Sequence, residues 1–402
     1  MIKVLRIMHR INIGGPTHHA GYLTKYLNNQ KFSTKLIVGN LDKFEKSGKY
    51  ILDDMGVTPF YVNNMFRKIH LIKDIKAYYE IIKIIKEYKP DIVHTHAAKS
   101  GFLGRLAAIS CNVPIIIHTF HGHVFHSYFN YFITRFYIFI ERFLAKKSTK
   151  IIAISNLQKE ELVNKFKIAP ANKFDVVSLG FDLDKFKENQ YLKRKSFRKE
   201  FNIIDDEIAI GIVGGLAPIK NHKLFIESIN FIRKKTDVKL RFFIIGDGEE
   251  RENIQKLCHN LDIQFNTHID TFYNKILCFT SWRQDIDYIN SGLDIMTCTS
   301  FNEGTPVSLI EAQASALPIV TTSVGGIKDV VIENKSALIS KSINTIEFSN
   351  LLLKLINNKS LLSELSKNGR DHVFNKYTKD ILVNNITNLY ENLYKKLKLK
   401  CL

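Results

Sequence analysis

The 402-residue chain has only five cysteines, and none of them stands at a spacing typical of metal ligands. They are odd in number and scattered, at Cys111, Cys258, Cys278, Cys298 and Cys401. This excludes the dense disulfide framework of small secreted domains and a cysteine-based zinc site. We therefore expect a protein of the reducing cytoplasm.

Long apolar runs are also missing. The most apolar stretch, residues 125–144, is interrupted by Arg135, Glu141 and Arg142, which argues against a membrane-spanning helix. Residues 3–9 predict a strand, and they lack the long apolar segment and small-residue cleavage site of a signal peptide. Any membrane contact is expected to be peripheral, on the inner face of the cytoplasmic membrane.

Acidic residues are scarce beside basic ones, 39 against 58, so the formal net charge is +19. An anionic partner is expected, and nucleic acid, an anionic membrane or a nucleotide diphosphate would each satisfy that charge. The absence of an arginine-rich run or an RNA-binding signature argues against nucleic acid. No Gly-x-Gly-x-x-Gly follows the first strand of either half, which argues against an NAD-dependent oxidoreductase.

What the chain does contain is an alternation of short apolar runs and segments of helical spacing, typical of βαβ units and parallel sheets. We predict strands at residues 3–9, 35–38, 91–94, 115–119, 151–154, 208–213, 240–245 and 295–299. Residues 181–206 lack a strong apolar period and are predicted to connect two domains. The prediction is α/β, with doubly wound Rossmann-like domains at 1–182 and 183–376 and a C-terminal helix, 377–402, packing back toward the first domain.

Ligands of such sheets lie beyond the carboxyl ends of the strands. The first half has Gly14-Gly15, His94-Thr-His96 and the segment from His118 to His123 at the predicted strand ends. These groups mark a candidate binding edge.

The second half has a more informative segment, residues 300–311, which predicts a strand end, a loop and a helix start. Thr305 is expected to cap a helix that begins at Pro306, where proline's missing N–H costs nothing. The free N–H groups and positive dipole end of that helix favour a phosphate. Glu303 precedes the helix and Glu311 lies more than one turn inside it, so they would hold different parts of an extended ligand such as a nucleotide-sugar.

Taken together, these segments resemble the GT-B fold retaining glycosyltransferases of family 4. The resemblance covers almost the whole chain and rests on an ordered series of motifs: Gly14-Gly15, Pro90-Asp-Ile-Val-His-Thr-His96, Thr119-Phe-His-Gly-His123, Val213-Gly-Gly-Leu-Ala-Pro-Ile-Lys220, Gly246-Asp-Gly248 and Phe301-Asn-Glu-Gly-Thr-Pro-Val-Ser-Leu-Ile-Glu311. It implies two Rossmann-like domains that face each other across a cleft.

The resemblance also implies an activity. The enzyme would transfer a hexosyl or N-acetylhexosaminyl group from a UDP-sugar to a saccharide or lipid-linked acceptor, in surface polysaccharide or glycolipid synthesis. The nucleotide-sugar is a substrate, and family members need no metal, so no cofactor is expected. Two alternatives remain open: a UDP-sugar epimerase of the same fold, and a catalytically impaired nucleotide-sugar-binding protein.

Several residues acquire roles from the resemblance. The pair Glu303 and Glu311, the EX7E motif, would contact the donor sugar and the ribose hydroxyls respectively, and His121 would steady the reacting sugar. The remaining donor-binding positions are Gly14, Gly15, Gly304, Thr305 and Val307. Lys220 follows a tight glycine turn, where a cation would neutralise the charge developing on the leaving diphosphate.

One position departs from the family pattern. Where family members have arginine in a Gly-Arg-Leu triplet, this chain has Gly215. Glycine cannot replace a bidentate phosphate ligand, so either another cation compensates, with Arg241 and Arg283 as candidates, or activity is impaired.

The weaker candidates lie on the acceptor side: His96, Lys99 and His123. Lys99 and Arg105 would touch an acceptor phosphate or simply belong to a solvated helix start. The histidines suggest a metal, but no acid has the matching spacing. Asp285-Ile-Asp287 looks like a metal-binding DxD pair, although acids in the first turn of a helix explain it adequately.

The aromatic helix predicted at residues 128–147 has two interpretations. A helix that is apolar nearly all round is typically buried. Alternatively, its aromatics with Arg135, Arg142, Lys146 and Lys147 would rest on an anionic leaflet.

Overall fold

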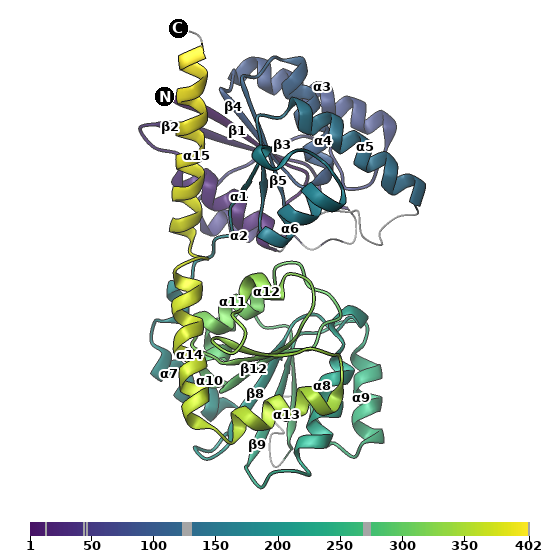
Figure 1. The fold of residues 1–402 in the computed structure, drawn as a ribbon, viewed down its shortest axis with the longest axis vertical. Helices are drawn as coiled ribbons and strands as arrows, with labels where there is room; N and C mark the ends of the chain where they lie inside the picture. Colours follow the sequence, from purple (N-terminus) through teal and green to yellow (C-terminus); the bar gives the residue numbers. More distant parts are fainter. Residues whose placement is uncertain (13, 43–44, 46, 123–130, 268–274, 401–402) are drawn as a thin grey trace. The chain divides into compact units, whose positions relative to one another are not determined.

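The computed structural model describes residues 1–12, 14–42, 45, 47–122, 131–267 and 275–400. The chain forms two units, one made of residues 1–181 and 377–402 and the other of residues 182–376. Each contains a seven-stranded sheet in which the described strand pairs are parallel, with helices on both faces (Figure 1). This is the α/β, doubly wound architecture expected from the alternating pattern.

The sheet of the first unit has the strand order β3-β2-β1-β4-β5-β6-β7. Its strands are β1 (Ile2–Met8), β2 (Phe32–Val38), β3 (Phe60–Tyr61), β4 (Ile92–His96), β5 (Ile115–Phe120), β6 (Lys150–Ala153) and β7 (Phe174–Val176). The order reverses between β1 and β4, where Met8 pairs with His96. Their carboxyl ends therefore lie side by side at the switch point, where doubly wound sheets bind ligands.

Helices cover both faces of this sheet. They are α1 (Gly15–Tyr26), α2 (Lys49–Asp54), α3 (Leu71–Tyr88), α4 (Ala98–Ser110), α5 (Tyr131–Lys147), α6 (Asn156–Glu160), which continues as a π-helical turn at Glu161–Lys165, and α15 (Lys379–Lys400). On one face α3 and α4 bury Ile81 and Leu103 against Ile7. On the other, α1 and α15 bury Leu23 and Ile386 against the strands (Figure 1).

The last helix, α15, belongs to the first unit because its apolar residues lie in that unit's core. Leu382, Ile386 and Tyr390 are almost completely buried there. Each such side chain contributes about 1.5–3 kcal/mol relative to exposure. The hydroxyl of Tyr390 is also 2.7 Å from Nδ1 of His94.

The sheet of the second unit has the order β10-β11-β9-β8-β12-β13-β14, which reverses between β8 and β12. Its strands are β8 (Ile208–Val213), β9 (Leu240–Ile245), β10 (Phe265–Asn266), β11 (Leu277–Ser281), β12 (Ile295–Cys298), β13 (Ile319–Thr322) and β14 (Ala337–Ser340). Short 3-10 turns lie at Asp184–Phe186 and Pro218–Lys220.

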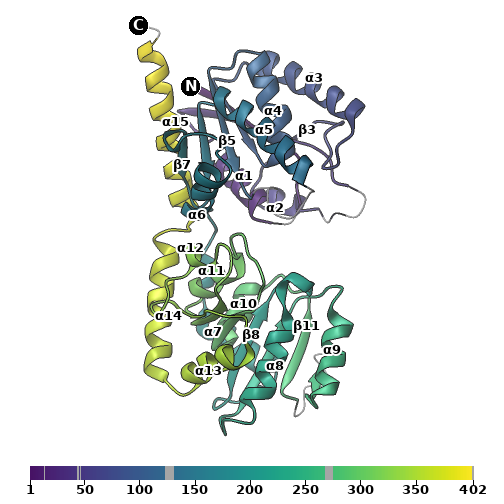
Figure 2. The same cartoon turned by 45° about the vertical axis from the view of Figure 1, so that its right-hand side comes forward.

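The helices of this unit are α7 (Gln190–Glu200), α8 (His222–Ile232), α9 (Arg251–Asn260), α10 (Ile286–Gly292), α11 (Val307–Ala314), α12 (Ile327–Val330), α13 (Thr345–Ile356) and α14 (Lys359–Phe374). Figure 2 shows α8, α9 and α13 gathered on one face, where Phe225, Ile254 and Phe348 enter a common core. Contacts of α7 with α10 and of α11 with α14 build the other face.

Three local predictions were wrong. The connection at 181–206 contains helix α7, whose Phe197 packs against Phe201 and Phe243 and whose Arg194 binds Asp294 at 2.7 Å. Phe243 and Asp294 lie far along the chain, so no local apolar period reveals them. Strand β4 runs through His96 instead of ending at His94, and helix α11 begins one residue later than predicted.

Candidate functional site

Lys220 and Glu303 form the centre of a candidate site in the second unit. Lys220 ends the 3-10 turn after β8, and Glu303 lies in the loop after β12, the neighbouring strand. Nζ of Lys220 is 2.6 Å from Oε1 of Glu303, and Oγ of Ser300 donates to the same oxygen at 2.6 Å. Two residues that the sequence assigned to separate parts of a ligand are therefore direct partners.

Two glycines that the sequence analysis did not single out hold this loop in place. The N–H of Gly326 donates to the carbonyl of Glu303 at 2.9 Å. A Cβ at Gly326 would lie 1.7 Å from the carbonyl oxygen of Gly304, and one at Gly325 would lie 2.1 Å from that of Glu303. Gly325 also has a φ of 48°, which glycine adopts at little cost. In the sequence, the signal that could have indicated this role is the pair of adjacent glycines that follows a strand.

The start of helix α11 differs from the prediction. Pro306, not Thr305, occupies the N-cap, because its ψ of 97° is not helical and its carbonyl accepts from Leu309 at 3.1 Å. Among the described residues, the backbone N–H groups of Gly304, Thr305 and Val307 have no hydrogen-bond acceptor. This helix start therefore still offers donors and a positive dipole end to an anion.

Glu311 lies on α11 with part of its surface exposed. Its surroundings raise its pKa to about 7, mainly by desolvation, with nearby Lys185 opposing the shift and Asp287 adding to it. Its carboxyl group has no hydrogen bond or ion pair within the described ranges. It is thus available to accept hydroxyl groups when ionised.

Both proposed substitutes for arginine at Gly215 have acidic partners of their own. Arg241 lies near the amino end of β9, where its backbone pairs with Ala209 of β8, whereas Gly215 follows the carboxyl end of β8. Its side chain binds Glu207 at 3.0 Å. Arg283 is held by Glu200 and Asp285 at 2.9 and 2.6 Å.

What lies beside Gly215 is aromatic. A Cβ there would meet the Trp282 ring at 3.5 Å, with the carbonyl of Asp247 at 3.8 Å. At the same edge, Arg251 binds the carboxylate of Asp247 at 2.6 Å and the hydroxyl of Ser281 at 2.7 Å. An arginine at Gly215 would have to share this space with the indole.

The predicted DxD pair is occupied by cations of its own unit. Asp285 is the N-cap of α10 and binds Arg283, while Asp287 binds Lys193 at 2.7 Å. Arg283 lowers the pKa of Asp285. The helix-start interpretation accounts for both acids.

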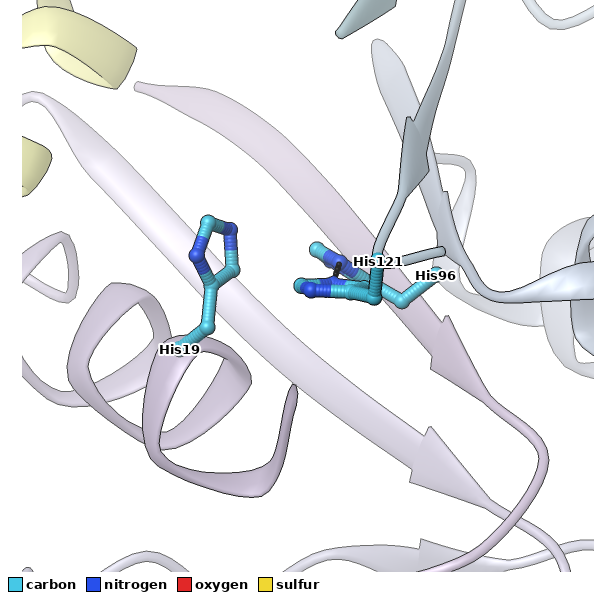
Figure 3. A group of neighbouring side chains, drawn as sticks. All are labelled: His19, His96 and His121. Carbon is cyan, nitrogen blue, oxygen red and sulfur yellow. Dashed lines mark hydrogen bonds between the residues drawn. The ribbon is translucent and has the colours of Figure 1, made fainter. Parts of the chain in front are cut away.

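In the first unit, histidines gather at the carboxyl edge of the sheet. His96 ends β4 and His121 follows β5, and their ring nitrogens, Nδ1 and Nε2, are 3.0 Å apart (Figure 3). Burial lowers the pKa of His121 to about 4 and holds that of His96 well below its ordinary value. Both rings are therefore neutral at pH 7.

The glycines after β1 lie at the same edge. The carbonyl of Gly14 accepts from Thr17 at 3.2 Å and starts helix α1, and Gly14 has a φ of 153°. A Cβ at Gly15 would be 3.4 Å from the Leu179 side chain. The switch point between β1 and β4 thus brings Gly14, Gly15 and His96 to one region of the sheet edge.

The acceptor-side candidates have mixed outcomes. Lys99 is mostly buried, with Nζ 2.6 Å from Asp74 and donating to the carbonyl of Lys68 at 2.7 Å. Arg105 is fully buried and binds Glu141 at 2.6 Å, so neither residue belongs to a solvated helix start. His123 lies outside the described residues.

The folds of the two units, each with a seven-stranded parallel sheet, define the class: a two-domain glycosyltransferase of GT-B architecture. The model of group 1 glycosyl transferases matches residues 193–372, and that of glycosyltransferase family 4 matches residues 13–185. The chain belongs to this family, the group 1 glycosyltransferases of family 4.

Known relatives agree with that assignment. The UDP-Gal:α-D-GlcNAc-diphosphoundecaprenol α-1,3-galactosyltransferase of Escherichia coli is 32% identical over 341 residues, which cover 84% of each chain. The capsular polysaccharide biosynthesis glycosyltransferase CapM of Staphylococcus aureus is 27% identical, over 83% of this chain and 85% of its own. The crystal structure of Anabaena HepE in complex with UDP has the same fold, with a TM-score of 0.80 at 15% identity, over 97% of this chain and all of the other.

Proposed function

We propose that the protein is a retaining glycosyltransferase that moves a hexosyl or N-acetylhexosaminyl group from a UDP-sugar to a saccharide or lipid-linked acceptor, in surface polysaccharide or glycolipid synthesis. The observation that carries the proposal is the Lys220–Glu303 pair at the carboxyl edge of β8 and β12. Glu311, whose carboxyl group has no partner in the described part of the chain, lies in helix α11 directly after the Glu303 loop. The 32% identical relative is named for a UDP-linked donor and a lipid-diphosphate acceptor, which supports the substrate class.

The site residues divide the work. Glu311 accepts the ribose hydroxyls, and the N–H groups of Gly304, Thr305 and Val307 bind the diphosphate or sugar hydroxyls. Glu303 holds the donor sugar, while Lys220 neutralises the leaving diphosphate. In the first unit, Gly14 and Gly15 are proposed to bind the donor, and His121 is proposed to steady the sugar as a neutral ring.

The anomeric configuration of the sugar is retained because the acceptor hydroxyl attacks from the same face that the diphosphate leaves. The bond from the anomeric carbon to the diphosphate oxygen breaks, the bond to the acceptor oxygen forms, and the acceptor proton passes to the leaving oxygen. Glu303 is bound by both Lys220 and Ser300, which suits it to positioning rather than to nucleophilic attack. Transfer needs no metal, because Lys220 and the α11 helix start supply the positive charge.

Product analysis tests this function. Purified protein with UDP-galactose, UDP-glucose or their N-acetyl forms, and a lipid-diphosphate sugar acceptor, is expected to release UDP and form an α-linked product, identified by NMR. A β-linked product would contradict retention. An isomeric UDP-sugar formed without acceptor would establish the epimerase instead, and UDP binding without turnover over the whole donor and acceptor set would establish a non-catalytic protein.

The membrane proposal rests on helix α5. Its aromatics Phe132, Phe136, Phe139 and Phe143 are 81, 62, 69 and 48% exposed, so the buried interpretation was wrong. Their spacing places them on one stripe of the helix.

A groove beside the C-terminal half of α5 is lined by Phe139 and Phe143 together with the cations Arg142, Lys146, Lys167 and Lys173. None of the described helices is long and apolar enough to span a bilayer. An anionic membrane surface is thus the proposed partner of this stripe, and nucleic acid is not.

Vesicle binding checks this partner. Phe136→Ser with Phe139→Ser is expected to weaken binding to phosphatidylglycerol vesicles by about a hundredfold, since each inserted phenylalanine contributes roughly 1.5 kcal/mol or more. Tyr79→Ser, an equally exposed aromatic on α3, is the control and should bind like the wild type. Equal binding by the double variant would show that the stripe does not meet the membrane.

A further inference from the structure

His19 joins the histidine pair of the first unit. It lies on α1, and its ring faces those of His96 and His121 (Figure 3), with centroid separations of 5.4 and 4.9 Å. His19 and His96 are completely buried. Within the described residues, neither ring nitrogen of His19 has a hydrogen-bond partner, nor do Nε2 of His96 and Nδ1 of His121. Buried polar atoms without partners are costly, so the two unpartnered nitrogens of His19 call for a ligand.

The geometry fits a small cation bound by imidazole. One ring nitrogen from each of the three residues lies within 4.8 Å of the other two. Tetrahedral zinc with bonds of about 2.0–2.1 Å needs nitrogens roughly 3.3 Å apart. The pair His96 and His121 is already at 3.0 Å, and the His19 ring must turn toward them to bring its nitrogen from within 4.8 Å to the same separation. Sequence reasoning missed His19 because it stands on a helix, far along the chain from the other two.

We propose that His19, His96 and His121 bind one zinc-like divalent transition-metal ion, and that this ion inhibits sugar transfer by engaging His121. The proposed metal binding does not depend on the proposed function, whereas the proposed inhibition of sugar transfer rests on it. Three protein ligands leave a fourth position for water.

The surroundings decide which ions are accepted. A metal bound to both Nδ1 of His96 and Nε2 of His121 replaces the proton of their hydrogen bond, which moves to the other nitrogen of its own ring. The buried guanidinium of Arg6 acts on His19 and His96 with its positive charge. It opposes any dication, and Mg²⁺ and Ca²⁺, which prefer oxygen ligands, gain nothing in return. Imidazole nitrogens favour zinc, copper or nickel.

Metal titration tests the binding without turnover. Competition with a chromophoric chelator is expected to show one tight Zn²⁺ ion per chain, and Co²⁺ to give the visible bands of a four-coordinate site. His19→Ala should weaken this binding by at least about tenfold, whereas His259→Ala, an exposed histidine of the second unit, should not. Unchanged affinity in His19→Ala would overturn the site. Should that variant unfold, His19→Asn and the Zn²⁺-dependent rise in wild-type melting temperature give the same comparison.

Inhibition is measured separately. Stoichiometric Zn²⁺ is expected to lower wild-type transfer, and EDTA to restore it. His19→Ala, normalised to its own metal-free rate, should lose the inhibition. Zn²⁺ binding with undiminished transfer would overturn the inhibitory part, and absence of any transfer in metal-free protein would count against the proposed function instead.

Discussion

Replacing Lys220 with alanine is expected to lower the turnover number by about two to three orders of magnitude, the effect of removing one preorganised donor from a developing oxyanion. Lys220 is the cation beside the α11 loop, 2.6 Å from Glu303, and Gly215 offers no second charge. The loss should appear in steady-state rates at saturating UDP-sugar.

A nearby lysine provides the matched control. Lys223 on α8 is 70% exposed and pairs with Glu227 at 3.7 Å, so Lys223→Ala should change rate and stability little. Near-normal turnover in Lys220→Ala would show that another group binds the diphosphate. Gly215→Arg in the Lys220→Ala background would then reveal whether this edge still accepts a phosphate ligand beside Trp282.

Glu303→Ala is expected to abolish transfer while UDP affinity remains within a few-fold of the wild type. Glu303 is proposed to hold the sugar, which UDP lacks. Glu311→Ala should instead weaken UDP by about tenfold or more, because its hydrogen bonds to ribose are charge-assisted. Calorimetric titration with UDP, alongside transfer rates, separates the two variants. Equal loss of UDP affinity in both would refute this division of roles.

If Lys220 and Glu303 acted independently, the losses of transfer rate caused by their single variants would multiply in the double variant. Because the two side chains are partners at 2.6 Å, their variants should not be additive. The double variant is expected to lose much less transfer than the product of the single losses.

UDP affinity should also depend on pH through Glu311. The ionised carboxylate accepts the ribose hydroxyls, and with a pKa of about 7 it is mostly protonated at pH 6 and mostly ionised at pH 8. Affinity should therefore rise about tenfold between these values. The same raised pKa makes Glu311 contribute to the free energy of unfolding. The contribution is fully present below pH 4.5 and is lost as the pH rises through 7. Glu311→Gln should remove the pH dependence of binding.

Much of the architecture could be predicted because parallel strands are buried on both faces and leave apolar runs in the sequence. Residues 208–213 and 240–245 match β8 and β9 without change. The sequence-based predictions were wrong where contacts with distant residues, instead of a local apolar pattern, determine the structure. Helix α7 depends on Phe197 and on an arginine bound to Asp294, and the aromatics of α5 proved to be exposed.

Local patterns in the sequence were sufficient to predict the fold class and the family. Spacing along one loop and helix also predicts where Glu303 and Glu311 lie relative to each other, whatever surrounds them. Which side chains contact one another could not be predicted from that spacing. The folded chain joins Lys220 to Glu303, pairs Arg241 and Arg283 with acids of their own, and brings His19 to His96 and His121. The reason is physical: those contacts form across neighbouring strands and between a helix and a sheet edge, and strand order is set by packing of the whole unit rather than by local spacing.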